Sequence, residues 1–194
     1  MNQLTLTACM VALAMTCTPL MGATILLQED FEGTFPPTDW TADGWQPATD
    51  LSSTYAQLTN PFSATASTLV SPVFSLVGMS DAELTFSWTP YESTSVGPLT
   101  VQLHEGGTLA AILFLQSPTA TNNPYLWASW GSVPVDLTPY VGKSDLSLVW
   151  SAGPIAEWQP GVDNVSVTGT PVPEPATLIL MGAGATLIFK RRWR

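Results

Sequence analysis

Cysteine and histidine are nearly missing from this chain of 194 residues. It has two cysteines, Cys9 and Cys17, both near the N-terminus, and a single histidine, His104. Thiolate metal sites, cysteine nucleophiles and histidine-rich zinc sites are therefore excluded from residues 24–172. A serine–histidine–aspartate triad would have to use His104, and no Gly-x-Ser-x-Gly motif accompanies any serine. With no disulfide available, residues 24–172 must be stabilised by burial or by a bound metal.

Positive charge is also scarce before the C-terminus. In residues 24–172 Lys143 is the only base against fourteen acids, which gives this segment a formal charge of −13. That sign disfavours binding to nucleic acid or to anionic lipid. Calcium ions and neutral or polar glycans are the partners that such a surface permits.

No uninterrupted apolar run reaches the roughly 20 residues that a membrane-spanning helix requires. Residues 4–21 are mostly apolar with interspersed threonines, which is typical of the hydrophobic part of a secretory signal peptide. We therefore predict that residues 1–23 form a helical signal peptide, read by the Sec export machinery and cleaved after Ala23. An uncleaved N-terminal anchor is the alternative.

The C-terminus has three parts. Pro173, Glu174 and Pro175 cannot continue a strand or open a helix smoothly. Residues 176–189 carry no charge, and a helix of them is only about 21 Å long. The end of the chain holds four of its five bases, at Lys190, Arg191, Arg192 and Arg194. These bases should stay in the cytoplasm by the positive-inside rule, so we predict a short transmembrane helix that retains the chain at the membrane. A permanent tail anchor is the alternative to a processed tail.

This order of parts, beginning at Val172-Pro173-Glu174-Pro175, resembles the PEP-CTERM sorting signal of Gram-negative bacteria. The resemblance covers residues 171–194. It implies processing by an exosortase, a membrane protease-transpeptidase of species that make extracellular polysaccharide. The protein would then pass from the inner membrane to the cell envelope, the outer surface or the extracellular matrix. The signal says nothing of what the cargo does.

Short alternating segments separated by turn residues fill the middle of the chain. The clearest lie at 84–88, 99–103 and 146–150, where apolar and polar residues alternate with a period of two. Helical periodicity is missing. Eight or nine such segments predict an all-β fold for residues 24–170, an antiparallel jelly-roll β-sandwich between the two terminal helices.

A second resemblance covers roughly residues 28–168. The segments that carry it are Phe31-Glu32-Gly33-Thr34-Phe35-Pro36-Pro37, Leu84-Thr85-Phe86-Ser87-Trp88 and Val162-Asp163-Asn164-Val165. Their order is similar to that in the choice-of-anchor J and MAM-like jelly rolls. The resemblance implies a surface protein with no shared catalytic chemistry.

Acidic residues lie at both ends of the predicted sandwich, at Glu29, Asp30, Glu32 and Asp163. In jelly-roll sugar-binding modules and MAM-like domains the first and last strands pair, and an acid from each can share a structural calcium ion. The resemblance thus implies a calcium site at these four residues, since calcium prefers several hard oxygen ligands. The alternative is an acidic edge that only deters strand pairing.

Tryptophan is frequent, and it allows two interpretations. Trp88 and Trp150 alternate with polar neighbours, which predicts core positions. Five others lie in loops or irregular segments and are candidates for stacking on sugar rings: Trp40, Trp45, Trp127, Trp130 and Trp158. Burial in the core is the alternative for these as well.

Together these patterns predict an exported, exosortase-sorted protein of the surface or matrix, with a non-catalytic binding or structural domain. Exopolysaccharide or other glycans are the expected partners, beside the membrane that holds the tail before processing. The alternative is a carbohydrate-active enzyme or carbohydrate-binding module of the jelly-roll type, because glycoside hydrolysis needs only two carboxylates.

Overall fold

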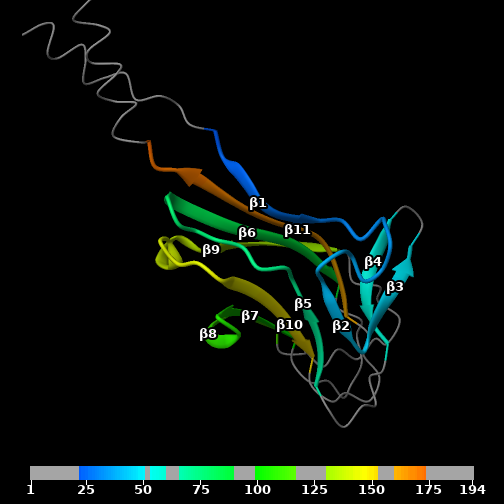
Figure 1. The fold of residues 1–194 in the computed structure, drawn as a ribbon. Helices are drawn as coiled ribbons and strands as arrows, with labels where there is room; N and C mark the ends of the chain where they lie inside the picture. Colours follow the sequence, from blue (N-terminus) through cyan, green and yellow to red (C-terminus); the bar gives the residue numbers. More distant parts are fainter. Residues whose placement is uncertain are drawn as a thin grey trace, which may run out of the picture.

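The structure, a computed structural model, describes residues 22–50, 53–59, 66–89, 99–116, 130–152 and 160–173. These residues form two antiparallel sheets packed face to face (Figure 1). The predicted all-β jelly-roll sandwich is confirmed. The described residues contain eleven strands rather than the eight or nine expected, and two short ones, at Thr41–Asp43 and Trp45–Thr49, lie where no alternating segment was predicted.

The first sheet has the order β3-β4-β11-β6-β9, with β1 also paired to β11. Its strands are β1 (Thr24–Glu29), β3 (Trp45–Thr49), β4 (Thr54–Leu58), β6 (Met79–Thr89), β9 (Gly131–Asp136) and β11 (Gly161–Pro171). The second sheet has the order β2-β5-β10-β7-β8. Its strands are β2 (Thr41–Asp43), β5 (Ser67–Val70), β7 (Leu99–Glu105), β8 (Thr108–Gln116) and β10 (Leu146–Ala152). A short 3₁₀ helix, η1 (Thr138–Tyr140), lies between β9 and β10.

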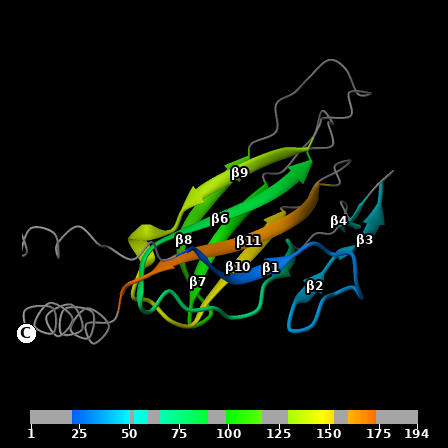
Figure 2. The ribbon, with the colours of Figure 1, turned by 90° about the horizontal axis from the view of Figure 1, so that it is seen from above.

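The last strand, β11, holds the first sheet together. One side of it pairs with β6 from Gly161 to Pro171, and the other side pairs with β4 at its start and with β1 further on. The β11–β6 register shifts between Asp163 and Ser166, next to Asn164, whose φ of 51° is left-handed. Because β1 and β11 are antiparallel, β1 begins where β11 ends, at one corner of the sandwich (Figure 2).

The core lies between the two sheets, and it follows the alternation in the sequence. Leu84 and Phe86 of β6 point inward and are buried, while their neighbours Thr85 and Ser87 remain half-exposed. Trp150 of β10 has no exposed surface. Its ring stacks on Trp40 at 5.8 Å and meets Phe86 edge-on at 6.1 Å. The predicted core position of Trp150 is confirmed.

Neither predicted terminal helix can be compared with the structure. Residues 1–21 and 174–194 lie outside the described residues. Within the described ranges, no helix has the length and apolar character needed to cross a membrane. The described strands run from Thr24 to Pro171.

Candidate functional site

Two of the four predicted calcium ligands meet beside Ser53, at the start of β4. The Ser53 Oγ atom lies 2.9 Å from Glu32 Oε1 and 2.9 Å from Asp163 Oδ2. The Thr54 backbone N–H donates to the same Glu32 oxygen at 2.9 Å. The beginning of β4 therefore fastens the loop after β1 to the central strand β11.

Asp163 is buried although it belongs to the outer face of its sheet. Its neighbour Val162 points into the core, so strand alternation places the Asp163 side chain on the opposite face. Only 3% of Asp163 is exposed. Its second oxygen, Oδ1, accepts a hydrogen bond from the Asn164 backbone N–H at 2.7 Å. The carboxylate is thus enclosed among hydrogen-bond donors, and Lys143, the one base within the described ranges, is paired with Glu105 instead.

Two negatively charged carboxylates share one serine hydroxyl here, and their charges are left without full compensation. A serine hydroxyl has one hydrogen, so it can donate to only one of the two carboxylate oxygens that flank it. Burial raises the pKa of Asp163, and the negative charges of Glu32 and Asp30 add to this effect against the hydrogen bonds from Ser53 and Asn164. The donors Thr54 and Ser53 lower the pKa of Glu32 instead. A proton on Asp163, or a cation near it, would supply that compensation.

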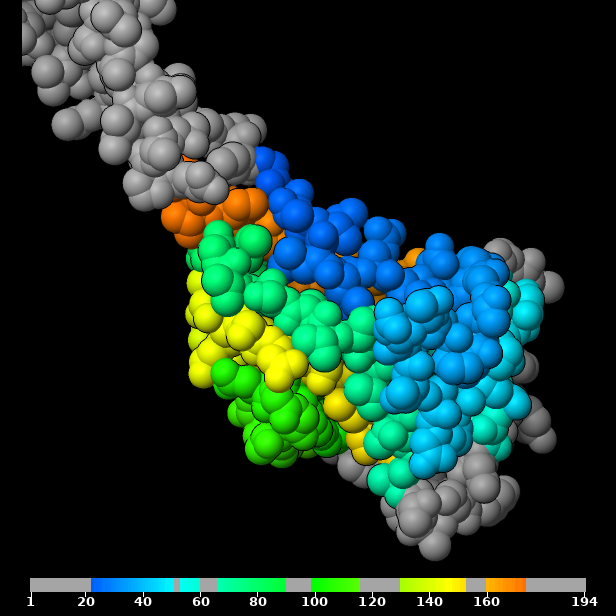
Figure 3. Space-filling view, in the orientation of Figure 1, coloured from blue at the N-terminus to red at the C-terminus, as the bar shows by residue number. Residues whose placement is uncertain are grey.

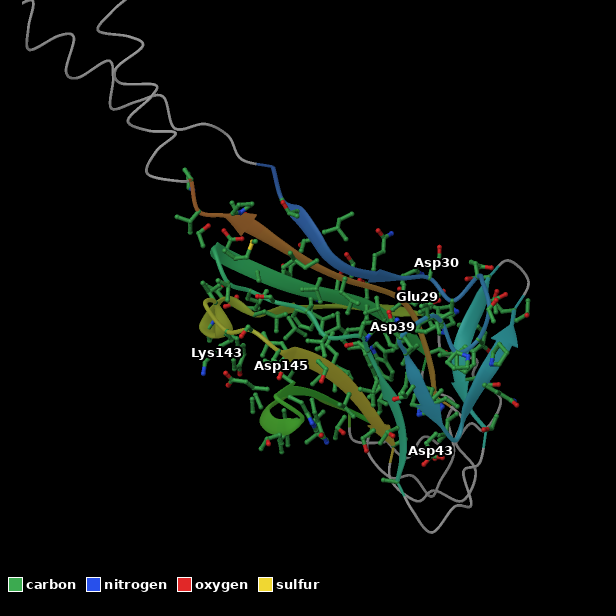
Figure 4. All side chains as sticks on the ribbon, in the orientation of Figure 1. Glu29, Asp30, Asp39, Asp43, Lys143 and Asp145 are labelled. Carbon is green, nitrogen blue, oxygen red and sulfur yellow. The ribbon has the colours of Figure 1, made fainter. Side chains whose placement is uncertain are left out.

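The other two predicted ligands are used differently. Glu29 Oε1 accepts the Phe31 backbone N–H at 2.7 Å, and Asp30 Oδ1 accepts the Glu32 backbone N–H at 3.2 Å. Their carboxylates therefore fix the loop after β1. Figure 4 labels both residues at the end of that strand. In the part of the chain that the structure describes, no group of three or more histidine, cysteine or acidic residues is arranged to hold a metal. The side chains as placed offer a cation two converging carboxylates, and calcium binding stays a prediction.

Sequence reasoning missed the residues that join this acidic site to an aromatic one. Asp50 Oδ1 accepts the Ser53 backbone N–H at 3.0 Å, and Asp50 Oδ2 accepts Trp130 Nε1–H at 3.2 Å. The only signal in the sequence was an aspartate three residues before a serine, which is typical of a turn. Nothing in the sequence indicates that Trp130, eighty residues later, lies beside that turn.

The aromatic part of the site consists of Tyr55 and Trp130. Their ring centroids lie 5.0 Å apart in an edge-to-face arrangement. Tyr55 lies over Gly161 of β11, where an added Cβ would come within 2.8 Å of the ring. Burial, together with the charge of Asp50, raises the pKa of the Tyr55 hydroxyl. Trp130 is half-buried, and its indole N–H is hydrogen-bonded to the Asp50 carboxylate.

Of the two interpretations of Trp40 and Trp45, burial in the core holds, and their candidacy for stacking on sugar rings is wrong. Each is only 5% exposed. Trp40 packs between Phe31, at 5.4 Å, and Trp150, because the loop after β1 folds over the edge of the core. Trp127 and Trp158 lie outside the described residues. Trp88, predicted to be core, is half-buried and packs on Phe114 at 5.6 Å.

The single histidine takes part in a small polar network on β7. His104 Nε2 lies 3.0 Å from Gln102 Oε1, and His104 Nδ1 lies 3.3 Å from the Gly107 carbonyl oxygen. Neither ring nitrogen contacts a serine hydroxyl or a carboxylate in these interactions. His104 therefore has the surroundings of a strand-end residue near a turn.

Comparisons with known proteins agree with this architecture. Residues 171–194 match the PEP-CTERM protein-sorting motif. The fold is similar to the K3 adhesin domain of Lys-gingipain from Porphyromonas gingivalis, with a TM-score of 0.57, 17% identity, and coverage of 75% of this chain and 100% of that one. The K1 adhesin domain of the same protein gives a TM-score of 0.57 at 16% identity, with 76% of this chain and 99% of that one covered.

The K2 adhesin domain of Lys-gingipain gives a TM-score of 0.53 at 15% identity, with 73% of this chain and 96% of that one covered. At these identities the similarity concerns the fold alone. No curated protein sequence matches this chain, and the choice-of-anchor J resemblance stays a prediction. The described strands thus form a jelly-roll sandwich whose last strand, β11, ends at the first residue that matches the PEP-CTERM protein-sorting motif.

Proposed function

We propose that this protein is exported, sorted by an exosortase through its C-terminal tail, and kept at the cell envelope, outer surface or extracellular matrix. Its sandwich serves there as a non-catalytic binding or structural component. The observation that carries this proposal is the position of the sorting motif. The motif begins at Pro171, the last residue of β11, so the described sandwich is the cargo that it delivers.

The acidic site supports a non-catalytic role. A pair of carboxylates can act as acid and base on a glycoside only if both reach the substrate. Asp163 is buried, and each of its oxygens has a hydrogen-bond partner: Oδ2 lies beside Ser53 Oγ, and Oδ1 accepts the Asn164 backbone N–H. Glu32 Oε1 likewise lies within hydrogen-bond distance of Ser53 Oγ and accepts the Thr54 backbone N–H. These contacts favour a role in holding β1, β4 and β11 together.

Processing of the tail is the direct test of the sorting proposal. In a host that makes the sorting protease, we expect mature protein without residues 176–194, because the apolar run and basic end act only as a retention signal. Mass spectrometry of protein released from the envelope would show this. The same chain produced in a host without the protease is the control and should keep its C-terminus. An intact Arg194 in the protease-containing host contradicts the proposal and favours a permanent tail anchor.

Glycan binding is a second candidate function, favoured by the contact among Tyr55, Trp130 and Asp50. A half-buried indole beside a carboxylate combines an apolar face for a sugar ring with an acceptor for its hydroxyl groups. If the sandwich acts as a carbohydrate-binding module, this acidic and aromatic site is where we place the sugar. The expected ligand is a neutral or polar polysaccharide, given the surplus of acids.

Binding to exopolysaccharide from the producing cells tests this candidate. We expect Trp130→Ala to weaken the affinity at least about tenfold, equivalent to roughly 1.4 kcal/mol, since one stacking surface is lost. Isothermal titration with and without calcium would measure it. Ile112→Ala, an exposed apolar residue on the other sheet, is the control and should bind like the wild type. Equal affinities for the Trp130→Ala variant and the wild type would contradict a glycan site here.

A further inference from the structure

The corner of the sandwich that carries the sorting motif also carries the start of the first strand. Thr24 pairs with Gly169 and Ile25 pairs with Thr168, so the first residues of β1 lie beside the last residues of β11. Beyond β11, the Val172 backbone N–H donates to the Gly78 carbonyl oxygen at 2.7 Å. Figure 3 shows the β1, β6 and β11 segments meeting at this corner.

Three large apolar side chains are exposed here. Ile25, Val77 and Val172 are 58%, 56% and 51% exposed. The hydrogen bond joins Val172 to Gly78, the residue that follows Val77. Ile25 pairs with Thr168, and Thr168 comes four residues before Val172 in the chain. At the usual rise of a strand, Thr168 and Val172 are about 13 Å apart. We call these three residues the terminal apolar corner.

The sequence beyond Val172 indicates what covers this corner. The uncharged run begins at Ala176, four residues on, and an extended chain of four residues spans at most about 14 Å. While the sorting motif holds this run in a membrane, the terminal apolar corner cannot lie far from the lipid. Apolar side chains so placed are stabilised by the interfacial region of a bilayer.

We propose that, before the tail is processed, the sandwich rests its terminal apolar corner on the lipid surface, with Ile25, Val77 and Val172 as the contact. The partner is a zwitterionic bilayer surface. The formal charge of −13 on residues 24–172 opposes an anionic one. Asp81 and Glu83 of β6, both exposed and paired with Thr170 and Thr168 of β11, remain in water and keep the contact shallow.

The only base of residues 24–172 belongs to the same end of the molecule. The Lys143 carbonyl oxygen accepts the Leu76 N–H at 2.9 Å, one residue before Val77. The Lys143 Nζ atom is paired with Glu105 Oε2 at 3.0 Å, so it adds little net charge. The contact therefore depends on apolar side chains rather than on electrostatic attraction.

Fluorescence quenching by labelled lipid tests the proposal. Full-length protein with Cys9→Ser and Cys17→Ser, made in a host without the sorting protease, is placed in phosphatidylcholine vesicles and recovered by flotation. A fluorophore is attached at Val77→Cys or, as the matched control, at Ile112→Cys, which is equally exposed on β8 of the other sheet. Lipids with a spin label near the headgroup should quench the fluorophore at position 77 several-fold more than the one at position 112. Equal quenching overturns the proposal.

Two double variants distinguish a lipid contact made by the terminal apolar corner from simple closeness to the membrane-held tail. With the label at position 77, Ile25→Ser with Val172→Ser should reduce quenching to the level of position 112, whereas Leu109→Ser with Leu115→Ser should leave it unchanged. If the Ile25→Ser and Val172→Ser double variant is quenched as strongly as the protein without these two substitutions, the proposal is overturned. All of these side chains are exposed, so the substitutions should leave folding intact. Protein that does not float contradicts membrane insertion of the tail, and this proposal with it. Floating protein with equal quenching contradicts only the lipid contact.

Discussion

Replacing Trp150 with alanine is expected to destabilise the sandwich by about 3 to 5 kcal/mol, because it removes the largest fully buried side chain from the middle of the core. Trp40 and Phe86 would both lose a ring neighbour. The loss is a large share of the roughly 5 to 15 kcal/mol that usually separates folded from unfolded protein. Urea unfolding followed by circular dichroism would measure it.

Trp130→Ala is the matched control for this prediction. The same atoms are removed, but from a half-buried ring just before β9 whose neighbours are Tyr55 and Asp50. We expect a loss of about 1 kcal/mol or less, since partly exposed positions contribute less to stability. If both variants lose the same free energy of unfolding, Trp150 is not the centre of the core.

Asp163→Asn is expected to remove both a pH dependence and a calcium dependence of stability. Burial raises the pKa of Asp163 in the folded protein. A raised pKa contributes stability that is fully present below the unfolded value of about 3.9 and is lost as the pH rises through the folded value. At neutral pH the calcium-free protein therefore carries an unfavourable charge, which asparagine lacks. The difference in melting temperature between wild type and variant, followed from pH 3 to pH 8, isolates this residue.

A bound calcium ion would also compensate the negative charge of Asp163. If it binds Glu32 and Asp163 in the folded state alone, it adds about 2.7 kcal/mol at a hundredfold excess over its dissociation constant. We expect a rise of several degrees in the melting temperature of the wild type, most of which disappears in Asp163→Asn.

Asp145→Asn is the control for calcium. Asp145 lies exposed in the turn before β10, with a φ of 59° that asparagine also tolerates. General screening by a divalent ion would raise the melting temperature of both variants alike. A wild type whose melting temperature does not change with calcium contradicts calcium binding, and the acids then only fasten the loop after β1.

Much of the fold could be read from local patterns. The alternation around Phe86 indicates which face of β6 is buried, and the placement of Trp150 follows from the same rule. The loop from residue 34 to 45 could not be read in this way. Trp40 and Trp45 are flanked by turn residues, which is typical of exposed segments, yet Trp40 packs onto the core from the loop after β1 and Trp45 begins strand β3, and both rings are buried.

The candidate site shows the same limit. Acids near both ends of the sandwich could be found by inspection, because first and last strands pair in the folds that this chain resembles. Ser53 could not, since its role depends on a hydroxyl that reaches Glu32 and Asp163 across 21 and 110 residues of sequence. Trp130 likewise acquires its acid partner only through the packing of β9 beside β6 and the hairpin of β3 and β4.

By itself the sequence determined the fold class, the scarcity of bases and thiols, and the sorting motif at the C-terminus. All three depend on composition and on neighbours within a few residues. Only the tertiary structure decided which tryptophans are covered, which carboxylates share a hydroxyl, and that β1 begins beside the end of β11. These features depend on contacts between strands distant in the chain, and such contacts are set by the packing of whole sheets rather than by any local run of residues.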